Sequence, residues 1–134
     1  MEKNDYKYSY SRKVAFKDTD MAGVVHFTQL LAYAEEAEHE ALLQAAVEPI
    51  SSKGGFPKAH SSCDYRSPAR YGDVLQVCVG IAELSARSIQ WKFALYRADQ
   101  LVCEGDFITV FVNTRGEPEG IDDALKATLA SLVI

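Results

Sequence analysis

Residues 28–47, TQLLAYAEEAEHEALLQAAV, contain neither glycine nor proline and are dominated by alanine and glutamate. Both residue types favour helix, so the stretch predicts one long helix. Small and apolar residues recur along it at steps of three and four, which predicts a smooth face that can lie close against a sheet: Leu30, Ala34, Ala37, Ala41 and Ala45. The glutamates fall mostly on other faces, which predicts a solvated surface for Glu35, Glu36, Glu38 and Glu40.

Strand-like segments surround this helix. Residues 6–16, YKYSYSRKVAF, alternate apolar and polar side chains and predict a first strand that is half buried. Pro49 and the SSKGG sequence at 51–55 predict the end of the helix and a flexible connection. Alternation returns further along, so strands are predicted at 56–65, 74–84, 89–95 and 101–112, with a turn at 67–73, a hairpin turn at 98–100 and a short helix from Ile121.

One helix between a first strand and a run of antiparallel strands is an α+β arrangement. A chain of 134 residues is too short for two domains of typical size, so residues 1–134 are expected to form a single domain. The second face of the sheet and its edge strand would still need cover. A partner subunit is the economical solution, and a homodimer or homotetramer is expected.

Composition excludes several classes of function. With 14 basic and 19 acidic residues the formal charge is −5, which argues against nucleic acid or an anionic membrane as the main partner. The N-terminus has no apolar signal region and no stretch is long enough to span a membrane, so a cytoplasmic protein is expected. The cysteines form no CxxC pair and the histidines no HExxH motif, so neither a disulfide framework nor a metal site is expected.

The densest group of unusual residues lies just before the helix, in FKDTDMAGVVHF at 16–27. A carboxylate that precedes a helix N-terminus by several residues can face the unpaired amides of the first turn across a small gap. A thioester carbonyl fits this gap: the amides would stabilise an oxyanion while the carboxylate attacks the carbonyl or activates a water. The alternative is that Asp18 or Asp20 only caps the loop or the helix. For Gly23, permissive turn dihedrals and room for a ligand are both open.

The sequence DTDMAGVVHF at 18–27 resembles the signature of the 4-hydroxybenzoyl-CoA thioesterase family, and CDYRSPARYGD at 63–73 supports the match, which extends over about residues 8–113. This resemblance implies a hotdog fold, in which a curved antiparallel sheet wraps around one long central helix, and an active site at a dimer interface. It assigns catalysis to Asp20, as nucleophile or general base. It also implies that the backbone amide of Phe27 polarises the thioester carbonyl and that Asp18 is structural.

The same resemblance implies the substrate contacts. Coenzyme A phosphates are commonly held at a basic strand hairpin, which here offers Arg87 as the only cation, with Ser88 as a hydrogen-bond donor. His26 is expected in the wall of the acyl pocket. His60 lies in FPKAH at 56–60, which resembles the branch acting on 1,4-dihydroxy-2-naphthoyl-CoA, and it is expected either to reach a ring hydroxyl or to be an ordinary strand histidine.

The predicted function is therefore hydrolysis of an aromatic acyl-CoA, with coenzyme A as part of the substrate and no separate cofactor. Two other functions fit the same fold. One is an acyl-carrier-protein thioesterase, which would act strongly on carrier-bound acyl groups and weakly on CoA esters. The other is a non-catalytic acyl-CoA-binding protein, against which the retention of Asp20 in an intact motif argues.

Overall fold

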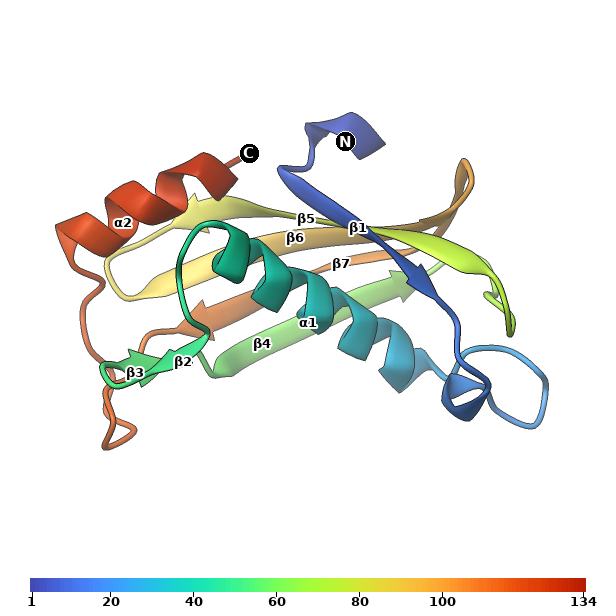
Figure 1. Cartoon of the computed structure of the whole chain (residues 1–134), viewed down its shortest axis with the longest axis horizontal. Coiled ribbons are helices and arrows are strands. Elements are labelled where there is room, and N and C mark those ends of the chain that lie inside the picture. Colours follow the sequence, from blue (N-terminus) through green and yellow to red (C-terminus); the bar gives the residue numbers. More distant parts are fainter.

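A computed structural model describes all residues, 1–134 (Figure 1). The long helix α1 spans Phe27–Gln44, and a shorter helix α2 spans Asp123–Leu129. Five strands form the main sheet, and two very short strands form a separate hairpin. The main strands are β1 (Tyr8–Lys13), β4 (Lys58–Tyr65), β5 (Val74–Leu84), β6 (Ser88–Arg97) and β7 (Gln100–Val110), and the hairpin strands are β2 (Ile50–Ser51) and β3 (Gly54–Gly55).

The main sheet is antiparallel throughout, with the strand order β1-β5-β6-β7-β4. Helix α1 crosses one face of the sheet (Figure 1). The three central strands carry the residues of the covered face, whereas most of β4 is exposed. This is the α+β hotdog architecture that the sequence predicted.

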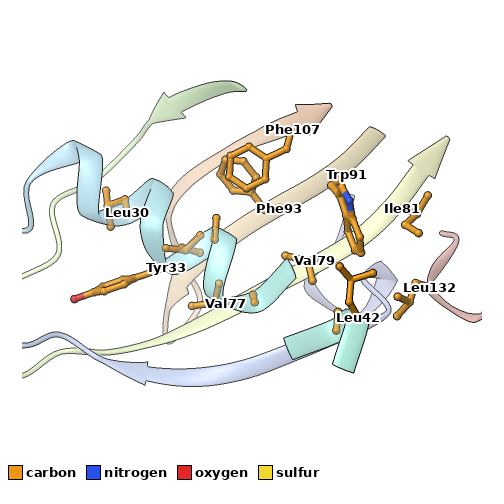
Figure 2. Close-up of a cluster of buried hydrophobic side chains, with 14 of the residues drawn as sticks. Leu30, Tyr33, Leu42, Val77, Val79, Ile81, Trp91, Phe93, Phe107 and Leu132 are labelled. Carbon is orange, nitrogen blue, oxygen red and sulfur yellow. The ribbon is translucent and has the colours of Figure 1, made fainter. Parts of the chain in front are cut away.

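The core lies between α1 and the sheet (Figure 2). Ala34, Ala37 and Ala41 are fully buried on the helix face that meets the sheet, as their spacing predicted. Because these side chains are small, the volume between the layers is filled mainly by large residues of the strands. Trp91 and Phe93 are two of the large side chains that fill this volume. Other buried apolar residues of the strands fill it with them: Val77, Val79, Ile81 and Phe107.

The chain's C-terminal end closes one side of this core. Leu129 at the end of α2 and Leu132 just beyond it are both buried. Leu132 lies beside Leu42 and Ile81 in the core cluster (Figure 2). The last residue continues the contact, since the amide of Ile134 donates to the carbonyl of Ile81 at 2.8 Å.

Several boundaries differ from the sequence prediction for local reasons. The first strand ends at Lys13 rather than residue 16, because Phe16–Asp18 form a 3₁₀ turn. Helix α1 ends at Gln44 rather than near residue 47, because Ala46 adopts a left-handed conformation with φ of 63°. The 51–55 segment, predicted as a flexible connection, contributes to the β2–β3 hairpin.

Glu38 contradicts the prediction of a solvated glutamate surface. Its side chain is 1% exposed and lies on the face of α1 that meets the sheet. The amino group of Lys58, at the start of β4, lies 2.7 Å from Glu38 Oε1 and supplies the opposite charge. Periodicity alone could not predict this burial, because the compensating lysine comes from a strand 20 residues further along the chain.

Gly105 in β7 provides a test of the β4–β7 packing. A Cβ added at this position would collide with the carbonyl oxygen of Ser62 and would lie 2.8 Å from Phe93 Cζ. Because the collision is with backbone, Gly105→Ala should lower the free energy of unfolding by about 2 kcal/mol or more. Gly120→Ala is the matched control, since its nearest neighbour would be 3.8 Å away. Equal thermal melting midpoints for the two variants would contradict the observed packing.

Candidate active site

The loop that precedes α1 is built by short-range backbone hydrogen bonds. The amide of Asp20 donates to the carbonyl of Val24 at 2.8 Å, and the amide of Gly23 donates back to Asp20 at 3.0 Å. Gly23 has φ of 80°, which explains a glycine at this turn. The amide of His26 donates to the carbonyl of Asp18 at 3.0 Å and closes the loop, and the amide of Val25 attaches it to the segment before β5 by donating to the carbonyl of Ala69 at 2.8 Å.

Asp18 is buried beneath this loop and ties it to α1. The hydroxyl of Tyr33 donates to Asp18 Oδ2 at 2.6 Å, and the amino group of Lys17 lies 3.0 Å from Oδ1. Arg12 lies 3.7 Å from Oδ2 and stacks over the Tyr33 ring at 4.3 Å. The hydrogen bond from Tyr33, aided by Lys17 and Arg12, holds the pKa of the Asp18 carboxyl below its usual range. These contacts are those of a structural carboxylate.

Asp20, two residues further, has a different environment. It is exposed, and its Oδ1 accepts hydrogen bonds from the amide of Ala22 at 2.9 Å and, more weakly, from that of Val24 at 3.4 Å. Its Oδ2 has no hydrogen-bond partner within the chain. One oxygen therefore shapes the loop, as the capping alternative predicted, and the other is unpartnered within the chain.

Asp20 and the first turn of α1 line the same hollow, which has a volume of about 490 Å³ and is called the Asp20 hollow below. Phe27 is the first residue of α1, and its amide has no acceptor within the chain. The neighbouring amide of Thr28 is capped by His26 Nδ1 at 3.3 Å. A free amide at the positive end of an 18-residue helix is a suitable donor to a developing oxyanion.

Aromatic rings form part of the wall. The ring centroids of His26 and Phe27 lie 4.7 Å apart. Tyr65, at the end of β4, meets Phe27 edge to face with 6.1 Å between the ring centroids. Tyr65 and Arg66 were not singled out individually from the sequence, although they fall in the second motif at 63–73. The hollow as a whole is lined by Asp20, Val24, Val25, His26, Phe27, Leu30, Tyr65, Arg66, Ser67, Pro68 and Ala69.

Four of the five expected substrate-binding residues lie outside this hollow, and only His26 lines it. Gly23 is not among the residues that line it. His60 lies on the face of the sheet that points away from α1. Its Nε2 lies 3.9 Å from Asp106 Oδ1. Phe107 points into the core, so its neighbour Asp106 points to the other face. Within one chain, His60 therefore cannot contact a ligand held at Asp20.

Arg87 and Ser88 lie at the far end of the sheet from Asp20. The Asp20 loop is joined to the segment before β5 by a bridge between Val24 and Arg70, whereas Arg87 follows the end of β5. Because β5 has 11 residues, these two ends are roughly 30 Å apart. Figure 1 shows the same separation: the α1 N-terminus and the β5–β6 hairpin lie at opposite ends of the molecule.

Comparison with known proteins places the chain among thioesterases. Residues 14–129 match a family described as the thioesterase-like superfamily. A 1,4-dihydroxy-2-naphthoyl-CoA hydrolase from Synechococcus sp. strain CC9605 is 32% identical and is matched over 88% of this chain and 89% of its own. The crystal structure of a 1,4-dihydroxy-2-naphthoyl-CoA thioesterase from Synechocystis superposes with a TM-score of 0.85 and 26% identity, covering 93% of this chain and 96% of that one.

The fold and these relatives define the chain as a thioester hydrolase. It belongs to the thioesterase-like superfamily, and the resemblance to the 1,4-dihydroxy-2-naphthoyl-CoA branch that the sequence indicated is confirmed. Neither helix is long and apolar enough to cross a membrane. No group of three or more histidine, cysteine or carboxylate side chains is placed to hold a metal ion.

The contacts of Asp18 predict a pH-dependent contribution to stability. A carboxyl whose pKa is lower in the folded than in the unfolded chain stabilises the fold above its unfolded pKa, and this contribution is lost as the pH falls through the folded pKa. The loss should occur below about pH 4. The melting midpoint of Asp18→Asn should therefore be several degrees below that of the parent at pH 7. This difference in melting midpoint should narrow as the pH falls below about 4.

The matched control for this thermal melting series is Glu119→Gln, which removes an exposed carboxyl with no hydrogen bond. It should follow the parent at every pH. A difference between Asp18→Asn and the parent that stays constant from pH 7 to pH 3 would contradict the assigned role of the charge.

Proposed function

We propose that the chain hydrolyses an aromatic acyl-CoA to the free acid and coenzyme A, with Asp20 as the catalytic carboxylate. The observation that carries this proposal is that Asp20, which has one oxygen without a partner, and Phe27, whose amide has no acceptor, line one hollow. A thioester whose carbonyl oxygen accepts from the Phe27 amide would have its carbonyl carbon directed toward Asp20. The aromatic rings of the wall, and the naphthoyl substrate in the names of the relatives, support an aromatic acyl group.

The reaction can follow either of two balanced routes. In the first, Asp20 Oδ2 attacks the carbonyl carbon, the C–S bond breaks with departure of the CoA thiolate, and water then hydrolyses the acyl anhydride. In the second, Asp20 accepts a proton from a water that attacks the same carbon, the C–S bond then breaks, and the CoA sulfur leaves and takes up that proton as the thiol. In both, negative charge develops on the carbonyl oxygen, where the Phe27 amide and the α1 dipole stabilise it. Both routes require Asp20 to be ionised.

A second copy of the chain is part of this proposal. Strand β4 is an edge strand, and its residues 59–62 are all exposed. Such an edge is a template for pairing with another strand, and pairing with β4 of a second copy gives the homodimer that the resemblance implies. Because Arg87 is far from Asp20 of its own chain, its proposed phosphate contact, with Ser88 beside it, would be made to the substrate of the other chain.

Asp20→Asn separates catalysis from loop capping. The asparagine retains an oxygen that can accept the loop hydrogen bonds but removes the charge, so kcat should fall by about 100-fold or more while the melting midpoint changes little. The measurement is steady-state release of CoA thiol from 4-hydroxybenzoyl-CoA.

Asp18→Asn is the control for this assay, because Asp18 is buried away from the hollow and should lose much less turnover at a temperature where the variant is folded. Turnover of Asp20→Asn close to that of the parent would disprove the proposed mechanism.

Arg87→Ala tests the phosphate contact. A contact remote from the reacting carbon forms in both the ground and the transition state, so its loss should raise KM for CoA esters more than it lowers kcat. The corresponding N-acetylcysteamine thioester lacks the nucleotide, and its kcat/KM should not change in the variant. An unchanged KM for the CoA ester would remove Arg87 from the site.

A further inference from the structure

A second hollow, of about 620 Å³, lies at the other end of β4 and is called the Lys58 hollow below. Its polar lining includes Lys58, Glu35 and His39, and its apolar lining includes Phe56 and Pro57. It is separate from the Asp20 hollow, with which it shares no residue. The position of its charged residues is not explained by the chemistry at Asp20 within the same chain.

Lys58 is held by two carboxylates of α1. Its amino group lies 2.6 Å from Glu35 Oε2 and 2.7 Å from Glu38 Oε1, and it lies over the Phe107 ring at 4.6 Å. Burial raises the pKa of the Glu38 carboxyl, whereas the hydrogen bond from Lys58 lowers that of Glu35. Both oxygens of Glu38 are buried and neither accepts a hydrogen bond, so Lys58 compensates this carboxylate by charge alone.

Stability does not explain this cluster. Taking charges out of water costs several kcal/mol per ion, and apolar residues of similar volume are often equally or more stabilising. Helix α1 already meets the sheet through alanines, so another small or apolar residue could occupy position 38. A charged cluster at the rim of a hollow is therefore better explained by a ligand that the charges recognise.

The ligand cannot be held by Asp20 of the same chain. Tyr65 lines the Asp20 hollow and Lys58 lines the other one, and they stand seven residue steps apart at opposite ends of β4. At about 3.3 Å per residue, this is about 23 Å, which exceeds the length of an aromatic acyl group.

A two-fold partner removes this separation. If two copies of β4 pair antiparallel about the middle of the strand, between Ser61 and Ser62, the Lys58 end of each strand lies opposite the Tyr65 end of the other. The Lys58 hollow of one chain then adjoins the Asp20 hollow of its partner. The two hollows together make one site that neither chain contains alone.

We propose that Lys58 is a specificity-determining residue that acts in the partner's active site, where it binds a hydroxyl substituent on the acyl group whose thioester lies at Asp20 of the other chain. One ammonium proton is donated to Glu35 Oε2, whereas Glu38 Oε1 lies 2.7 Å from the same nitrogen as an ion-pair partner only, so Lys58 keeps donor capacity for the ligand. Glu35 has a second oxygen that can accept. A donor and an acceptor side by side match a hydroxyl, which both donates and accepts. This inference rests on the proposed function.

The first test compares two substrates that differ by one hydroxyl, 4-hydroxybenzoyl-CoA and benzoyl-CoA. The ratio of their kcat/KM values should fall about 10-fold or more in Lys58→Met, because the hydroxyl loses its charged partner. The double variant Lys58→Met/Glu38→Gln leaves no uncompensated buried charge and should show the same fall. Lys92→Met, on the opposite face of the sheet, is the control and should keep the parent's ratio. An unchanged ratio in the folded Lys58 variants would overturn the proposal.

The second test asks which chain supplies Lys58. Hybrid dimers are purified by two tags from co-expressed Asp20→Asn and Lys58→Met chains. Only the Lys58→Met chain keeps Asp20, so the hybrid has one active site. If Lys58 acts across the interface, the Asp20→Asn chain supplies an intact Lys58 to that site. The hybrid then regains the parent's substrate ratio at about half the parent's activity. If Lys58 acts only within its own chain, that site keeps the low ratio of Lys58→Met, and the proposal fails.

Failure of this inference is distinguishable from failure of the proposed function. Full turnover by the Asp20→Asn homodimer would disprove the catalytic proposal whatever Lys58 does. An inactive Asp20→Asn homodimer together with an unchanged ratio in the Lys58 variants would disprove only the specificity proposal. Light scattering on each sample should give at least a dimer, and a monomeric parent would overturn the shared site.

Discussion

The close approach of α1 to the sheet is the constraint on which the rest of the structure depends. Three buried alanines allow the helix to lie against the central strands, while the large side chains of the strands fill the remaining volume. This contact places the first turn of α1 beside the end of β4, where Phe27 meets Tyr65. The same contact carries Glu38 into the interior, where it is tolerated because Lys58 reaches it from the edge strand.

The elements that the sequence predicted well are those determined by local pattern. The helix and the five main strands follow from periodicity, and Asp20 and Phe27 of the motif at 18–27 line one hollow. Glu38 was missed because burial of a charge depends on a partner distant in the chain. The distance of His60 and Arg87 from Asp20 was not predictable, because a strand pattern does not show which end or face of the sheet lies beside the loop before α1.

A single chain separates the groups that a substrate would need. The free carboxylate and helix amide lie at one end of the sheet, and the β5–β6 hairpin and the Lys58 hollow lie at the other. Two-fold symmetry is the simplest operation that brings opposite ends of one surface together, and it does so twice in each dimer. An edge strand that is unpaired in the monomer can thus serve assembly and substrate recognition at once.

Asp18 and Asp20 show how two identical side chains two residues apart come to differ in role. Asp18 is buried and both of its oxygens have partners, so its carboxylate holds the loop against Tyr33 of α1. Asp20 lines the hollow and has one oxygen bound to the loop and one without a partner, so the loop holds it without using all of its capacity as an acceptor. The buried contacts of Asp18 therefore fix the loop, and Asp20 is positioned while one of its oxygens stays unpartnered, as the proposed catalytic role requires.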